Sequence, residues 1–164
     1  MMRQGGPVRL LAVGGAWKVM LRGILIGLVA GLPLAVLNTV ALQFSEGQVI
    51  HWQNPLAALL DALQSGIVEE VIYRFALWGL LWLVLRSSLG ARSAFLAGLL
   101  ATLIHAYSHL DMLFVQAPLA ALGMGLVMVL FWGLPPLLLA RRQGLESAIA
   151  FHWIQDVALF TAGF

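Results

Sequence analysis

The sequence lacks cysteine and is poor in charged side chains over its length of 164 residues. Without cysteine, disulfide bonds, thiolate nucleophiles and thiolate-bound metals are excluded. Asp, Glu, Lys and Arg together make up 10% of the chain, whereas hydrophobic residues make up 62% and the mean hydropathy is +0.96. Because a soluble core of this size needs fewer apolar residues, the composition predicts a membrane protein.

The sequence also lacks the alternation of apolar and polar residues that is typical of transmembrane β-barrels. Its apolar runs are continuous, and only helices satisfy their backbone hydrogen bonds within a single segment in lipid. No internal repeat and no low-complexity linker divides the chain. We therefore expect an all-α integral membrane protein, a helical bundle with a single domain over residues 1–164.

The basic residues give a formal net charge of +2 but form no patch with interleaved aromatic residues, so nucleic acid is not an expected partner. Five apolar segments are instead predicted to cross the bilayer, which requires about 20 residues per helix. They cover residues 23–44, a part of 55–85, 93–109, 119–140 and 145–164. Residues 1–22 carry four basic side chains and are predicted to lie at the membrane surface.

Two of these segments have features that interrupt a regular helix. The run over residues 55–85 is too long for one upright span, so its first turns are expected at the interface or separated by a break near Ser65-Gly66. Pro135-Pro136 is expected to kink the fourth segment or to end it early.

Positive charge orients this arrangement, because Lys and Arg concentrate in cytoplasmic loops. With five spans, the basic residues of segment 1–22 and two later pairs fall on one side: Arg86 with Arg92, and Arg141 with Arg142. The sequence thus predicts a protein of the cytoplasmic membrane with its N-terminus inside. The lipid bilayer is its first expected partner.

The most unusual stretch places Glu69, Glu70 and Arg74 inside a predicted span, where uncompensated charge is costly. Residues four apart lie on the same helix face, so Glu70 and Arg74 are expected to form an ion pair. Glu69 points about 100° away from Glu70. One carboxylate can therefore be structural while the other works. Alternatively, the pair only neutralises itself and Glu69 makes a polar contact between helices.

Two further polar pairs have the same spacing in later spans, His105 with His109 and His152 with Asp156. His109 lies near a span end, so a packing or interfacial role is preferred for it, whereas His105 lies deeper. The pair of His152 and Asp156, taken alone, is equally compatible with an isolated hydrogen bond along one helix.

Together with Glu69, these side chains allow a reaction. A carboxylate and a neutral imidazole can share the deprotonation of a water molecule. A second imidazole with a polar neighbour can then hold the oxyanion that forms when water attacks an amide carbonyl. The pattern therefore predicts hydrolysis of a peptide bond inside the membrane.

The ordered set of motifs resembles the CAAX-protease and bacteriocin-processing family of intramembrane endopeptidases, also called the ABI family. The similarity extends over residues 65–156 and consists of Glu69-Glu70-x-x-x-Arg74, then His105 one helix on, then His152-x-x-x-Asp156. The resemblance implies a membrane-embedded protease core. It also implies that Glu70 and Arg74 support the site, and that the substrate is a membrane-anchored, lipid-modified or hydrophobic-tailed protein or peptide.

The resemblance further implies that Glu69 and His105 activate the water and that His152 with Asp156 stabilises the oxyanion. Two positions depart from the family pattern. Ala101 stands four residues before His105, where the family often has Phe, so the packing of the pocket is expected to differ. Asp156 replaces the frequent Asn and cannot donate a hydrogen bond when ionised, so it is either protonated or orients His152.

Three alternatives remain open. Glu69, His105 and His152 are suitable ligands for zinc with an open fourth position, although the H-E-x-x-H pattern is absent and the resemblance favours hydrolysis without a cofactor. The chain is also compatible with a non-catalytic membrane binding or immunity protein on the same scaffold. A proton- or ion-conducting bundle is the third alternative, although the chain has no internal repeat typical of transporters.

Overall fold

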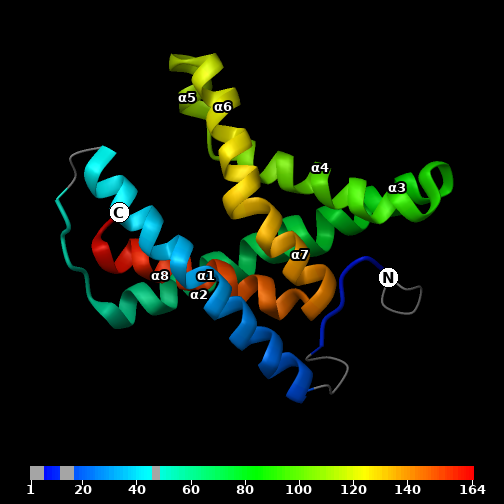
Figure 1. Ribbon diagram of the computed structural model, residues 1–164, viewed down its shortest axis with the longest axis horizontal. Helices are drawn as coiled ribbons and strands as arrows, with labels where there is room; N and C mark the ends of the chain where they lie inside the picture. Colours follow the sequence, from blue (N-terminus) through cyan, green and yellow to red (C-terminus); the bar gives the residue numbers. More distant parts are fainter. Residues whose placement is uncertain (1–5, 12–16, 46–48) are drawn as a thin grey trace.

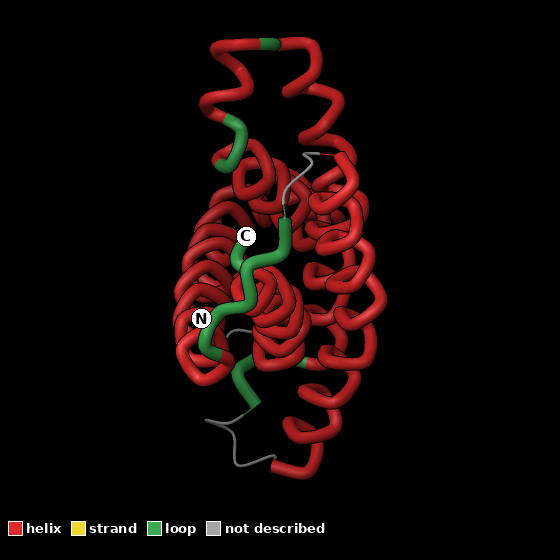
Figure 2. Tube along the Cα trace, turned by 90° about the vertical axis from the view of Figure 1, so that its left-hand side faces the viewer, coloured by secondary structure: helices red, strands yellow, loops and turns green. Residues whose placement is uncertain are grey.

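A computed structural model describes residues 6–11, 17–45 and 49–164 of the chain. Every regular element in this part is helical, which confirms the expected all-α class (Figures 1 and 2). The elements are α1 (Trp17–Ser45), α2 (Pro55–Glu69), η2 (Glu70–Leu77), α3 (Trp78–Leu89), η3 (Gly90–Arg92), α4 (Ser93–Ser108), α5 (Asp111–Gln116), α6 (Pro118–Met128), η4 (Val129–Gly133), α7 (Leu134–Gln143) and α8 (Leu145–Ala162). The predicted surface segment 1–22 lies partly outside the described residues, at positions 1–5 and 12–16.

Helix α8 packs between α1, α2 and α7 (Figure 1). The contact with α1 is close because glycines recur every fourth residue along one face of α1, at Gly23, Gly27 and Gly31. A Cβ atom at Gly27 would collide with the carbonyl oxygen of Ser147. Small residues that bring helix backbones together are a common means of helix association in membranes.

Helical structure is continuous from Pro55 to Leu89, so the break considered near Ser65-Gly66 does not occur. Gly66 instead allows close packing, since a Cβ atom there would lie 3.4 Å from the backbone nitrogen of Trp153 on α8. The helix changes its geometry further on, in the π-helical segment η2. Such widened turns are frequent at functional sites.

The fourth predicted segment does not end early at Pro135-Pro136 but continues through α7 to Gln143. Pro135 stands in the first turn of α7, where a missing backbone N–H is tolerated. The preceding segment η4 is π-helical, and its wider hydrogen-bonding pattern accommodates the transition. The prolines therefore accompany a change in helix geometry and not a stop.

A core cluster forms where α3, α4, α7 and α8 meet, around Trp78, Leu137 and Leu145, all nearly inaccessible to solvent. Val8 of the N-terminal segment also belongs to this cluster. In addition, the carbonyl oxygen of Arg9 accepts a 2.9 Å hydrogen bond from the backbone nitrogen of Leu145. The described stretch 6–11 of the N-terminal segment thus packs against the bundle, a contact that its basic composition did not predict.

Two helical stretches among the described residues are long and apolar enough to cross a membrane, Trp17–Phe44 and Pro118–Gln143. They correspond to the first and fourth predicted spans. Both carry large exposed apolar side chains, among them Val29 at 64% and Leu126 at 56% exposure. The third predicted span, α4, is shorter, with 16 residues. The second and fifth predicted spans contain the charged and polar residues of the site, which lower their hydropathy.

Candidate active site

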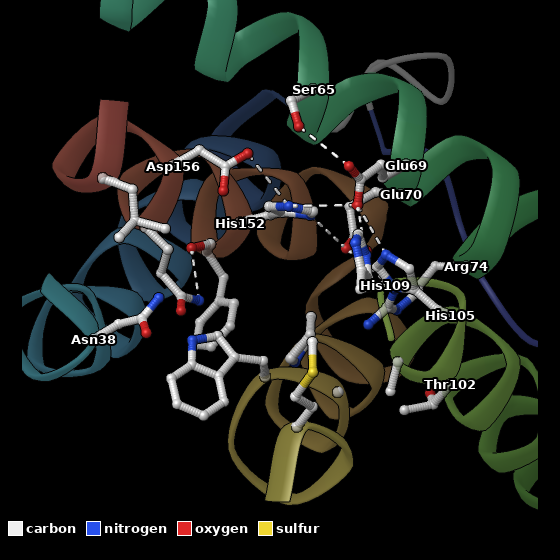
Figure 3. A pocket seen from close by; sticks show the side chains of 18 of the residues that line it. Asn38, Ser65, Glu69, Glu70, Arg74, Thr102, His105, His109, His152 and Asp156 are labelled. Atoms are coloured by element: carbon white, nitrogen blue, oxygen red, sulfur yellow. Dashed lines mark hydrogen bonds and ion pairs between the residues drawn. The ribbon is translucent and has the colours of Figure 1, made fainter. Parts of the chain in front are cut away.

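All six predicted site residues line one cavity of about 340 Å³ (Figure 3). They come from three helical elements that are distant in sequence: the junction of α2 with η2, the end of α4, and the middle of α8. The set consists of Glu69, Glu70, Arg74, His105, His152 and Asp156. The bundle therefore brings together the three polar insertions that the sequence shows separately.

Glu69 is held through both of its carboxylate oxygens. Its Oε2 atom lies 2.8 Å from Nε2 of His105, and its Oε1 atom accepts a 3.3 Å hydrogen bond from the hydroxyl of Ser65. The side chain keeps 26% of its surface accessible. Glu69 is thus oriented by two donors and still open to the cavity.

His105 is fixed on both edges and on one face. The guanidinium of Arg74 contacts Nδ1 of His105, and because arginine has only donors, Nδ1 accepts. In the neutral ring the proton is then on Nε2, which donates to Glu69. Tyr73 stacks on the imidazole with ring centroids 4.1 Å apart and an angle of 15° between the rings.

The expected pair of Glu70 and Arg74 is present, with 3.5 Å between Oε1 of Glu70 and NH1 of Arg74, and both residues are 1% exposed. The same Glu70 oxygen lies 3.1 Å from Nδ1 of His152 on α8. The buried pair therefore does more than neutralise itself. It contacts both candidate imidazoles, His105 through Arg74 and His152 through Glu70.

Because Nδ1 of His152 is engaged by Glu70, Nε2 is the ring nitrogen that remains for the cavity (Figure 3). This Nε2 atom lies 3.4 Å from Oδ2 of Asp156 and 3.7 Å from Oε2 of Glu69. The expected contact between His152 and Asp156 is therefore present, and it is not isolated, because the same ring also approaches both glutamates.

His109 is closer to the site than its position near a span end suggested. Its Nε2 atom lies 3.7 Å from Oε2 of Glu69, and the side chain is 47% exposed at the cavity. The packing or interfacial role preferred for His109 therefore describes only a part of its position, because the ring also approaches Glu69. The i, i+4 spacing from His105 was the available signal, because it places both rings on one side at the C-terminal end of α4, where their centroids are 5.1 Å apart.

Ligand atoms of Glu69, His105 and His109 all lie within 4.8 Å of one another and form a possible metal-binding group among the described residues. This group differs from the predicted zinc set, in which His152 took the place of His109. Ser65 and Tyr73 are also part of the surroundings of the site, although neither stands out in the sequence. The stacking of Tyr73 on His105 depends on where η2 lies relative to α4, whereas the contact of Ser65 with Glu69 is an i, i+4 contact within α2 that the spacing could have indicated.

Ala101, where the resembling family often has Phe, does not border the cavity. It is 1% exposed and belongs to the core cluster around Trp78. The neighbouring Gly98 also faces Trp78, whose indole atoms would lie 2.7 Å from a Cβ atom there. The large indole of Trp78 thus occupies space that the small residues of α4 leave free. Alanine in place of the family's Phe therefore affects the packing of the core and not the lining of the cavity.

The fold and the site together define a helical protein with a partly buried glutamate and three histidines at a cavity between its helices. The sequence matches the family described as type II CAAX prenyl endopeptidase Rce1-like over residues 51–158, and the chain belongs to this family. No curated protein and no solved structure matches the chain. With its apolar helices, this membership identifies a membrane protein of a protease family.

Proposed function

We propose that the protein is an intramembrane endopeptidase that hydrolyses a peptide bond of a membrane-anchored, lipid-modified or hydrophobic-tailed protein or peptide. The observation that carries the proposal is the 2.8 Å contact between Glu69 and His105 at a cavity that His152 also lines. The family description as a CAAX prenyl endopeptidase supports peptide hydrolysis as the reaction and a membrane-associated chain as the substrate.

In the proposed reaction, the Glu69 carboxylate takes a proton from a water molecule, and the resulting hydroxide attacks the scissile carbonyl carbon. Nε2–H of His105 donates to Glu69 and holds the carboxylate in position. The carbonyl oxygen becomes an oxyanion that accepts a hydrogen bond from Nε2–H of His152. Because Nδ1–H of the same ring donates to Glu70, His152 is doubly protonated in this step. When the C–N bond breaks, Glu69 returns its proton to the leaving amine, so the base is regenerated.

Glu70 and Arg74 act as positioning residues in this scheme, since each contacts one of the two imidazoles. Asp156 supports the oxyanion site from 3.4 Å. As an ionised carboxylate it accepts hydrogen bonds only, so it acts by orienting His152; a protonated Asp156 would donate directly, as the amide of Asn does.

The proposal includes five crossings of the cytoplasmic membrane. They are α1, the continuous helical stretch from α2 through α3, then α4, the continuous helical stretch from α6 through α7, and finally α8. They form one domain over residues 1–164 with the protease core at 65–156 and the N-terminus inside.

Since the chain has no cysteine, a single cysteine can be introduced at a chosen position as a reporter of this topology. With an impermeant maleimide on intact cells, Gln116→Cys should be labelled and Ser88→Cys should not. The opposite pattern would overturn this topology.

The catalytic assignment is tested with the full chain in liposomes. The probes are quenched peptides, one ending in a prenylated CAAX sequence and one in an unprenylated hydrophobic tail. We expect Glu69→Gln and His105→Ala to abolish cleavage. Two matched controls, Asp61→Asn and His51→Gln, change exposed residues that do not line the cavity, and both should remain active.

Retained turnover in both site variants would refute the assignment. Wild-type protein that cleaves neither probe, combined with a cellular phenotype that survives Glu69→Gln, would favour the non-catalytic binding or immunity protein. A flux of protons or ions across the liposome membrane that Glu69→Gln removes would favour the conducting bundle.

The grouping of Glu69, His105 and His109 favours one second candidate, the same hydrolysis with zinc at the site. Carboxylate and imidazole are suitable zinc ligands, and a fourth position would remain open to water. Dialysis against a chelator followed by zinc addition decides between the two. Full activity after chelation supports the reaction without a cofactor, whereas loss and recovery with zinc, together with inactivity of His109→Ala, supports the metal-dependent version.

A further inference from the structure

The cavity extends well beyond the cluster of carboxylates and imidazoles. A part of the remaining lining comes from α1, α6, η4 and α8 and is mostly apolar. We call this part the apolar arm: Asn38, Met128, Trp132, Phe151, Gln155, Leu159 and Phe160. Figure 3 shows Asn38 on the far side of the pocket from Glu69 and Arg74. None of these residues has a part in the proposed hydrolysis, so their two unpaired polar atoms require a separate explanation.

The first of these atoms is the side-chain carbonyl oxygen of Gln155. Gln155 is 4% exposed, and its Oε1 atom is buried without a hydrogen-bond partner. The amide orientation is set by the other end of the group, since Nε2 donates to the carbonyl oxygen of Phe151 at 3.4 Å. Oε1 is therefore the unpaired acceptor of a side chain that lines the cavity.

The second atom is the indole nitrogen of Trp132, in the π-helical segment η4. Nε1 of Trp132 is buried and has no hydrogen-bond partner, although the residue lines the same cavity. An indole N–H can only donate. Trp78 and Trp153 differ from it, because their indole nitrogens donate to the carbonyl oxygens of Ala94 and Leu59 at 2.7 and 3.0 Å.

A buried donor and a buried acceptor without partners are each costly, by about 1–3 kcal/mol per group. A ligand that supplies one acceptor and one donor removes both costs. A peptide unit has this composition, with one C=O for Trp132 and one N–H for Gln155. A substrate chain that enters an apolar cavity likewise needs partners for its backbone groups, because no bulk water is present to bind them.

The position of Gln155 fits a peptide unit close to the scissile bond. Gln155 follows His152 by three residues on α8, which corresponds to about 4.5 Å along the helix axis. An extended chain advances about 3.3–3.6 Å per residue. If the scissile carbonyl faces His152, the unit that reaches Gln155 is one or two residues away from it along the substrate.

We propose that Gln155 and Trp132 form a substrate subsite that binds the backbone of an extended, apolar peptide segment one or two residues from the cleaved bond. Oε1 of Gln155 accepts from the substrate N–H, and Nε1 of Trp132 donates to a substrate carbonyl. The apolar side chains of the arm, including Met128 and Leu159, surround the segment. This subsite rests on the proposed peptidase function and specifies how that function selects an extended chain.

The test measures binding separately from cleavage. The full chain carrying Glu69→Gln is placed in nanodiscs, and the two peptides named above, without the quencher, are titrated by fluorescence anisotropy. We expect Trp132→Phe and Gln155→Leu each to raise the Kd about five- to tenfold, the effect of one lost hydrogen bond. The controls are Trp153→Phe, whose indole donates to Leu59 outside the cavity, and exposed Gln64→Leu, and both should stay within twofold.

A second set of peptides separates a hydrogen bond from a structural effect. Each backbone N–H near the cleavage site is replaced in turn by an ester oxygen. For one of these esters, Gln155→Leu should have no further effect on Kd, because the N–H that Gln155 accepts from is already absent. Trp132→Phe should keep its effect on the same ester peptide, since the carbonyl partner remains.

The subsite is overturned if both variants bind the peptides within twofold of the parent, if Gln155→Leu weakens every ester peptide equally, or if neither peptide binds at all. Failure of the proposed function looks different. In that case the peptides bind and depend on Trp132 and Gln155, but the protein with Glu69 intact cleaves none of them.

Discussion

The buried pair of Glu70 and Arg74 offers a sharp test, because its two members can be removed singly and together. Both are 1% exposed and lie 3.5 Å apart. Removing one partner of a buried ion pair leaves an uncompensated charge and typically costs about 3–5 kcal/mol. We therefore expect Glu70→Ala and Arg74→Ala each to lower the free energy of unfolding by about this amount.

The double variant Glu70→Leu with Arg74→Met replaces both charges with apolar groups of similar volume, a change that is often close to neutral. Its loss of stability should be far smaller than the sum of the single losses. The measurement is unfolding in mixed detergent micelles with rising dodecyl sulfate, followed by circular dichroism. Asp61→Ala, an exposed change on α2, should stay within about 0.5 kcal/mol of the parent.

Activity should not follow stability in this series. The double variant is expected to fold well but to be inactive, because Nδ1 of His152 loses Glu70 and Nδ1 of His105 loses Arg74. Single losses below about 1 kcal/mol, or a double loss equal to the sum of the two, would refute the description of these residues as a tightly coupled buried pair.

Three further predictions concern packing and the surroundings of the imidazoles. Gly27→Ala should destabilise the protein by about 1–3 kcal/mol, because its Cβ has no space against α8, whereas Gly123→Ala, with no atom within 4 Å of the new Cβ, should stabilise it slightly in the same unfolding assay. Tyr73→Phe should keep most of the kcat for peptide cleavage, since the ring that stacks on His105 remains, and Tyr73→Ala should lower it; equal rates would contradict a positioning role. Asp156→Asn should retain or raise kcat and Asp156→Ala should lower it, whereas an inactive Asn variant would show that the carboxylate itself is required.

The sequence was sufficient for the class of protein, and it singled out the polar residues that the fold brings to one cavity. Continuous apolar runs allow only helices in lipid, so the all-α class followed from composition. Charges are costly in such runs, and for this reason Glu69, Glu70 and Arg74 stand out from the residues around them in the chain. The i, i+4 rule was sufficient for the Glu70–Arg74 pair and for the contact between His152 and Asp156.

The tertiary structure decided which helices face one another. The 2.8 Å contact of Glu69 with His105 and the 3.1 Å contact of Glu70 with His152 join residues 36 and 82 positions apart. The position of His109 at the cavity, the continuous helix past Ser65-Gly66 and the change of helix geometry before Pro135-Pro136 depend on packing as well.

The physical reason for this division is the range of the forces involved. The cost of burying a charge depends on the apolar residues next to it in the chain, and helical periodicity depends on spacing within one helix. Both can therefore be read directly from the sequence. Contacts between helices arise only once the small residues of α1 and α8 set the distance between them. The sequence thus determined which polar residues must be satisfied in the membrane, and the fold alone decided that they satisfy one another around a single cavity.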